Sequence, residues 1–129
     1  MPHLTVEYTG NLGPQADIPA LLRKANAVLI AQGGVFPIGG IRSRAIRLDD
    51  FCVADGTADD AFVHLTLKIG AGRSAEQKRQ AGDALFAMVR DHFAELFASR
   101  FLALSLEIQE FSEAGTWKHN NIHGRYKAA

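Results

Sequence analysis

The sequence predicts a single α+β domain built from two β-α-β units. Two observations carry this prediction: a strand-helix-strand order of hydrophobic patterns occurs twice, at about residues 2–49 and 61–110, and each helix is long enough to cross over between parallel strands. The simplest assembly is one four-stranded sheet with both helices on its apolar face. Residues 111–129 form a polar tail. A chain of 129 residues is long enough for one hydrophobic core, so we expect a single domain over residues 1–129.

The first half begins with a strand over residues 2–9, in which apolar and polar side chains alternate. A helix follows, because Asp17 is a good N-cap and apolar residues then recur at helical spacing until Gly33 and Gly34. A second strand is expected over residues 41–48. Residues 49–60 are predicted to form a loop.

The second half repeats this plan. Residues 61–69 alternate as a strand, and Ser74 with Gln77 three positions later forms a capping box at a helix start. The apolar stripe after it predicts one long helix that runs to about Ser99. A last alternating strand covers residues 102–110.

The sheet face away from the helices is only partly polar. It carries the residues between the apolar ones, namely His3, Thr5, Glu7, Phe62, His64, Thr66, Lys68, Ala103, Ser105 and Glu107. Such a face can be wet, as in many antiparallel sheets, or it can be covered by copies of the same chain. We favour association with copies of the chain.

Composition narrows the function classes. Lys plus Arg and Asp plus Glu both number 14, so the net charge is zero and nothing points to nucleic acid or to an acidic membrane surface. No apolar run approaches the length of a membrane span, and no signal peptide is recognised. Cys52, the single cysteine, cannot form an internal disulfide and suits a reducing cytoplasm.

Pro2 is the first residue with candidate chemistry. Removal of Met1 would turn Pro2 into a chain-terminal secondary amine. Burial or a nearby guanidinium lowers the pKa of such an amine, and a neutral amine can act as general base and its conjugate acid as general acid. If Met1 is retained, the Pro2 nitrogen is an amide and has no basicity. A proline without any role is the alternative interpretation.

The segment Gly70-Ala71-Gly72-Arg73-Ser74 joins a strand to a capped helix. Its backbone N–H groups can meet an anion, and the Arg73 fork suits a carboxylate. The alternative is an ordinary turn with a solvated arginine. The segment lacks the lysine of a phosphate-binding loop, so we predict no nucleotide site.

Arg42 and Arg44 lie two positions apart on the second strand and therefore share a face. Two like charges there need a partner, which can be an anionic ligand or acidic residues nearby. The five histidines show no metal-site spacing within one element. His119 and His123 are four apart in a segment without a helical pattern, and we predict no metal site.

Together these segments resemble the 5-carboxymethyl-2-hydroxymuconate isomerases of the tautomerase superfamily. The resemblance spans nearly the whole chain. The matching stretches are Met1-Pro2-His3 with Val6-Glu7, Phe36-Pro37, Gly40 to Arg44, Ala61 to Ser74 apart from Leu65, Ala103 to Ser105, Glu107-Ile108, and Lys118 with Asn120-Asn121 and His123. The turn from Gly72 to Ser74, with residues 76–78, also resembles 4-oxalocrotonate tautomerase, a half-length relative, which fits the internal duplication.

The resemblance implies a tautomerase-like fold with a four-stranded mixed sheet, a homotrimer, and catalysis by an amino-terminal proline without metal or organic cofactor. It assigns acid/base chemistry to Pro2 and substrate binding to Arg42 and Arg73. Arg44 also matches the family motif, and we expect it to have a structural role. Because the first half has no Gly-Arg-Ser turn and the second has no proline heading its strand, we expect one site per chain. In a trimer, two neighbouring subunits would line each site.

The implied reaction converts 5-carboxymethyl-2-hydroxymuconate, a small carboxylate from the breakdown of aromatic acids such as homoprotocatechuate, into its unsaturated 2-oxo isomer. Two alternatives stay open. One is another enzyme of the superfamily: a phenylpyruvate-type tautomerase, a decarboxylase or a dehalogenase. The other is a non-catalytic trimeric protein that binds carboxylates.

Overall fold

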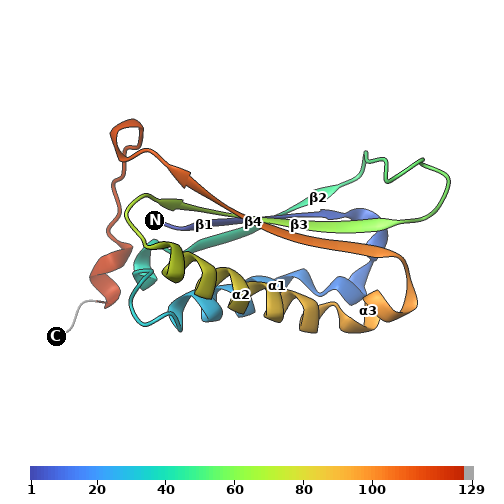
Figure 1. Cartoon of the computed structure of the whole chain (residues 1–129), viewed down its shortest axis with the longest axis horizontal. Coiled ribbons are helices and arrows are strands. Elements are labelled where there is room, and N and C mark those ends of the chain that lie inside the picture. Colours follow the sequence, from blue (N-terminus) through green and yellow to red (C-terminus); the bar gives the residue numbers. More distant parts are fainter. Residues whose placement is uncertain (127–129) are drawn as a thin grey trace.

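The computed structural model describes residues 1–126 and confirms the predicted two-layer architecture (Figure 1). One layer is a four-stranded sheet of β1 (His3–Thr9), β2 (Arg42–Leu48), β3 (Ala61–Gly70) and β4 (Leu102–Phe111). The other layer consists of α1 (Ile18–Ile30), α2 (Ala75–His92) and α3 (Ala94–Ser99). All three helices lie on the same side of the sheet, and no helix of the described chain covers the other side.

The sheet is mixed, with the strand order β2-β1-β3-β4. β1 pairs with β2 and β3 pairs with β4 in parallel, so α1 and α2 are the two crossovers that the sequence predicts. The two β-α-β units meet where β1 runs antiparallel to β3. In this register, His3 lies opposite Arg42 on one side and Lys68 on the other, at the end of the sheet where β1 begins.

The core lies between the sheet and the helices, as the alternation predicts. Leu4 and Val6 of β1 are fully buried there. The other fully buried apolar strand residues are Val63, Leu65, Leu67 and Ile69. The helices contribute Leu21, Ala25, Leu29, Ala81, Leu85 and Val89, and Phe93 is buried between α2 and α3. Burial of these side chains is the main force that holds the helices on one face of the sheet.

Both predicted helix starts are confirmed. The Asp17 side chain accepts a hydrogen bond from the Ala20 backbone N–H at 3.4 Å. Ser74 and Gln77 form the reciprocal capping box: each side chain accepts the backbone N–H of the other, at 3.1 and 3.0 Å. The second cap fixes the chain direction immediately after Arg73.

The prediction of one unbroken helix up to Ser99 is wrong, because the helix is interrupted at Phe93. Phe93 has φ −98° and ψ 11°, outside the helical range, and α3 starts after it. The Phe93 ring is fully buried, and the adjacent His92 ring is held by the Ala16 carbonyl oxygen at 2.7 Å. These tertiary contacts coincide with the break, and the apolar periodicity does not reveal them.

Candidate active site

The amino terminus lies at the end of the sheet between β1 and β2. Pro2 is buried, and its carbonyl oxygen accepts a hydrogen bond from the Arg42 backbone N–H at 3.0 Å. Met1 is present in the structure and extends from Pro2 into a cavity of about 410 Å³. The cavity is lined by Met1, Pro37, Gly40, Gly70, Arg73, Glu113, Lys118, Asn120 and His123.

Met1 occupies space that its removal would add to this cavity. Met1 packs against Gly40, where an added Cβ would lie 3.4 Å from both Cα and Cγ of Met1. The Asn120 amide nitrogen lies 3.7 Å from the Met1 sulfur. Loss of Met1 would therefore free the amine of Pro2 and also open the wall around it.

Arg73 enters the cavity from the turn between β3 and α2, where the sequence places it. Its Nε and Nη2 donate to the Val35 carbonyl oxygen at 3.2 and 3.0 Å, and its Nη1 donates to the Gly70 carbonyl oxygen at 3.2 Å. The guanidinium also lies 4.8 Å from the centre of the Phe36 ring. A guanidinium has five N–H groups, so these bonds leave one N–H on each Nη for an anion.

Arg42 lies behind the cavity wall. Its Nη1 donates to the carbonyl oxygens of Gly39 and Gly40 at 3.4 and 3.0 Å, and Gly40 itself lines the cavity. Arg44 does not reach this site. Its Nη1 contacts His3 Nδ1 at 3.1 Å on the open face of the sheet. The structure thus brings the chain start and Arg73 together, with Arg42 adjacent and Arg44 apart.

A group of residues from the carboxy-terminal segment completes the cavity. Asn120 donates to the Gly39 carbonyl oxygen at 3.0 Å, and the His123 backbone packs so closely on Gly39 that a Cβ there would lie 2.7 Å from the His123 Cα. Lys118 lies 3.4 Å from Glu113. The sequence interpretation gave these residues no role, because no local pattern relates a polar tail to a turn some 80 positions earlier. Two signals were available: the glycine pair at positions 39 and 40, which permits a close approach, and the presence of Lys118, Asn120 and His123 among the stretches that resemble the family.

The charges around the amine favour its neutral form. Burial is the largest cause that lowers the pKa of the Met1 amine, and the positive charges of Lys118, Arg73 and Arg42 lower it further. Glu113 acts in the opposite direction. A neutral amine surrounded by cations can accept a proton from a substrate whose carboxylates those cations attract.

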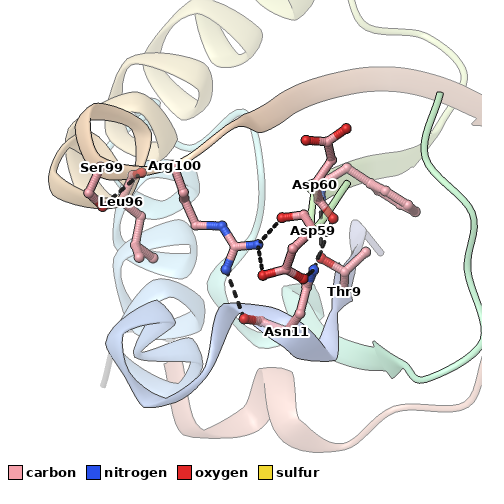
Figure 2. A network of polar contacts seen from close by, with 8 residues as sticks. Thr9, Asn11, Asp59, Asp60, Leu96, Ser99 and Arg100 are labelled. Carbon is pink, nitrogen blue, oxygen red and sulfur yellow. Dashed lines mark hydrogen bonds and ion pairs between the residues drawn. The ribbon is translucent and has the colours of Figure 1, made fainter. Parts of the chain in front are cut away.

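The opposite end of the sheet, where β3 begins, is closed by internal polar contacts (Figure 2). Arg100 donates to the backbone carbonyl oxygens of Asn11 at 2.8 Å and Asp59 at 2.7 Å. The Asn11 amide in turn donates to the Asp59 carboxylate and to the Asp60 carbonyl oxygen. The two ends of the sheet therefore differ. The end where β1 begins has a cavity lined by cationic side chains, and the end where β3 begins has a network of internal hydrogen bonds.

Other hollows of the described chain lack these features. One of about 740 Å³ lies along α2 and β4 and contains none of the predicted site residues. Within residues 1–126, no three His, Cys, Asp or Glu side chains are grouped where they could hold a metal ion. No helix in that range is long and apolar enough to cross a membrane.

The fold is shared with more distantly related solved structures. A solved structure described as "Q0 fused 4-OT wild type symmetric trimer" superimposes with a TM-score of 0.71 at 18% identity, over 92% of each chain. A member of the cis-3-chloroacrylic acid dehalogenase family gives a TM-score of 0.68 at 18% identity, over 92% of this chain and 81% of that one. At such identities the likeness concerns the fold alone.

Closer relatives define the family. The model of the 5-carboxymethyl-2-hydroxymuconate isomerase family matches residues 2–126, and the chain belongs to this family and is an isomerase. It is 50% identical over 127 residues to 5-carboxymethyl-2-hydroxymuconate Delta-isomerase of Escherichia coli, covering 98% of this chain and 100% of that one. It also matches a crystal structure of a 5-carboxymethyl-2-hydroxymuconate isomerase from Deinococcus radiodurans R1, with a TM-score of 0.95 and 61% identity, over 98% of this chain and 95% of that one. The resemblance stated from the sequence is confirmed.

Proposed function

We propose that this isomerase acts on 5-carboxymethyl-2-hydroxymuconate and uses the amine of Pro2, exposed by removal of Met1, as its acid/base group. One observation carries the assignment of the site. In a chain of this family, the amino terminus lies in a cavity that also contains the guanidinium of Arg73. A negatively charged substrate and a neutral amine base both suit such surroundings.

The reaction transfers a proton from the 2-hydroxyl oxygen to a carbon atom and shifts the conjugated double bonds accordingly. The neutral Pro2 amine takes the proton of the 2-hydroxyl group, so the O–H bond breaks and a dienolate forms. The protonated amine then delivers a proton to carbon, a C–H bond forms, and the unsaturated 2-oxo acid leaves with no net change in atoms. Arg73 binds a carboxylate, and Arg42 contributes to substrate binding through its positive charge behind the wall at Gly40. Both charges stabilise the negative charge on the dienolate oxygen.

The working form that we propose is a homotrimer in the cytoplasm. The open sheet face supports association, because it presents Ile46 and Phe62 among its polar residues and Ile46 is 48% exposed in the single chain. Fused relatives of the same fold form symmetric trimers. Cys52 is free and exposed, which suits a reducing compartment. Light scattering should give a mass of about 42 kDa, three times the 14.0 kDa of one chain.

The deciding experiment combines intact mass with an activity assay. The purified chain should be lighter than the full sequence by one methionine residue, and it should isomerise 5-carboxymethyl-2-hydroxymuconate in a spectrophotometric assay. A form with an extra residue retained before Pro2 should be inactive, because its proline nitrogen is an amide. Turnover of phenylpyruvate or haloacrylates instead would assign a different superfamily activity, and full activity of the extended form would rule out the proline mechanism.

A further inference from the structure

A third cation of the cavity has no part in the reaction described so far. Lys118 belongs to the carboxy-terminal segment, lines the cavity together with Met1 and Arg73, and has a side chain that is 39% exposed. Of the positive charges that act on the Met1 amine, Lys118 has the largest effect, ahead of Arg73 and Arg42. Its ammonium group thus belongs to the cavity lining, where its Nζ lies 3.4 Å from Oε2 of Glu113, and the side chain is also partly exposed to solvent.

The proposed substrate has a matching number of charges. A muconate carries two carboxylates, and the carboxymethyl substituent at carbon 5 adds a third. Arg73 has two free N–H groups, and Arg42 lies behind the wall at Gly40. Arg73 can bind one carboxylate bidentately, and Arg42 adds positive charge from behind Gly40. An ammonium is a point charge that suits one flexible carboxylate.

We propose that Lys118 is the specificity residue for the carboxymethyl group, whose carboxylate it binds at the mouth of the cavity. This inference rests on the proposed function and assigns the part of the substrate that distinguishes it from a plain 2-hydroxymuconate. A substrate without the third carboxylate gains nothing from Lys118. The same chain can then hold the shared dienoate with its arginines and select for the side branch with its lysine.

Glu113 holds the lysine in place when no substrate is bound. The two side chains lie 3.4 Å apart, and the carboxylate of Glu113 also closes on Gly70, where a Cβ would lie 2.5 Å from its Oε1. The pair is partly exposed, so the attraction between them is weak enough for a substrate carboxylate to compete. Glu113 thus competes with a substrate carboxylate for Lys118, and its negative charge lowers the affinity of the cavity for anions.

The test crosses one substitution with two substrates. Lys118→Met removes the charge and keeps the length of the side chain. With 5-carboxymethyl-2-hydroxymuconate, we expect kcat/KM to fall about ten- to hundredfold, mainly through KM, which is the loss typical of one charge-assisted hydrogen bond. On the high-pH plateau, where the amine is neutral in both proteins, kcat/KM for 2-hydroxymuconate, which lacks the carboxymethyl group, should stay within about twofold. Lys118→Arg should retain most of the discrimination between the two substrates.

Two further variants separate binding from a structural effect. Lys78 is a matched control, because its side chain is 31% exposed and its Nζ lies 3.5 Å from Oε2 of Glu110, outside the cavity. Lys78→Met should leave kcat/KM unchanged for both substrates. Glu113→Gln releases Lys118 and should keep or raise activity on the tricarboxylate. If Lys118→Met weakens both substrates equally or neither, or if Glu113→Gln reproduces its loss, Lys118 does not read the third carboxylate. A wild-type enzyme that turns over neither substrate would overturn the proposed function, and the role of Lys118 with it.

Discussion

Asn120 donates a hydrogen bond of 3.0 Å to the carbonyl oxygen of Gly39, across 81 positions of the sequence. This bond attaches the carboxy-terminal segment to the turn at Ile38–Gly40 that leads into β2. The same turn presents Gly40 to the cavity and receives the Arg42 guanidinium from the other side. A single contact thus links the segment that carries Lys118 to the wall behind which Arg42 lies.

A methyl group at position 39 should displace the segment. The Cβ of Gly39→Ala would lie 2.7 Å from the His123 Cα and 2.8 Å from its backbone nitrogen, distances that the backbone must relieve by moving. We expect lower kcat/KM and faster proteolysis in residues 113–126, measured by limited digestion and steady-state kinetics. Gly124→Ala is the matched control, because a Cβ there meets nothing within 4 Å. Equal behaviour of the two variants would show that the close approach is unimportant.

Pro2→Ala should cause a large but incomplete loss of activity. The variant keeps a free amine after removal of Met1, but the amine is primary and has more conformational freedom. Because a positioned acid/base group contributes roughly 10²- to 10⁴-fold, we expect a fall in kcat of about a hundredfold with a folded protein. Circular dichroism and intact mass are needed to confirm the fold and the processing. Wild-type kcat in a correctly processed variant would exclude Pro2 as the acid/base group.

Substitution of Arg73 should separate its two roles. Arg73→Lys retains the positive charge but loses the fork that holds the Val35 and Gly70 carbonyl oxygens, whereas Arg73→Ala loses both. We expect both variants to lose about 1–3 kcal/mol of unfolding free energy, since the Val35 carbonyl loses its partner. Activity should fall further in the alanine variant, mainly through KM. If the lysine variant is as inactive as the alanine variant, positioning of the loop and not charge is the main contribution.

The dependence of kcat/KM on pH should show the effect of the nearby cations on the pKa of the catalytic amine. Burial, Lys118, Arg73 and Arg42 lower the pKa of the Met1 amine, and Glu113 raises it. We expect the same charges to act on the Pro2 amine once Met1 is removed. Because the neutral amine is the base, kcat/KM rises with pH through this pKa, and the lowered pKa places the rise below the ordinary value of about 8 for an α-amino group. Lys118→Met removes one of the lowering charges, so its rise should move to higher pH. No movement would mean that Lys118 does not act on the amine.

Arg100→Ala should destabilise the fold without altering the active site. The Arg100 side chain is 19% exposed, and its loss leaves the carbonyl oxygens of Asn11 and Asp59 without their donor (Figure 2). We expect a loss of about 2–3 kcal/mol in urea unfolding with kcat/KM unchanged. Arg79→Ala, at an exposed arginine that pairs only with neighbours on α2, should change stability much less. A comparable effect of the two substitutions would contradict a structural role for this network.

The sequence by itself determined the order of strands and helices, the caps at Asp17 and Ser74, and the buried face of the sheet. These features follow from alternation, helical spacing and capping, which act between residues close together in the chain. It also offered Pro2, Arg42 and Arg73 as candidates, and the resemblance to a known family, rather than any local pattern, assigned their roles.

Only the tertiary structure decided what surrounds those residues. It ended α2 at Phe93, separated Arg44 from the cavity, and brought Lys118, Glu113 and Asn120 from the tail to the chain start. The physical reason is that these contacts join residues tens of positions apart. Their energy depends on close approach at glycines and on shared carbonyl oxygens, and neither leaves a periodic pattern in the chain.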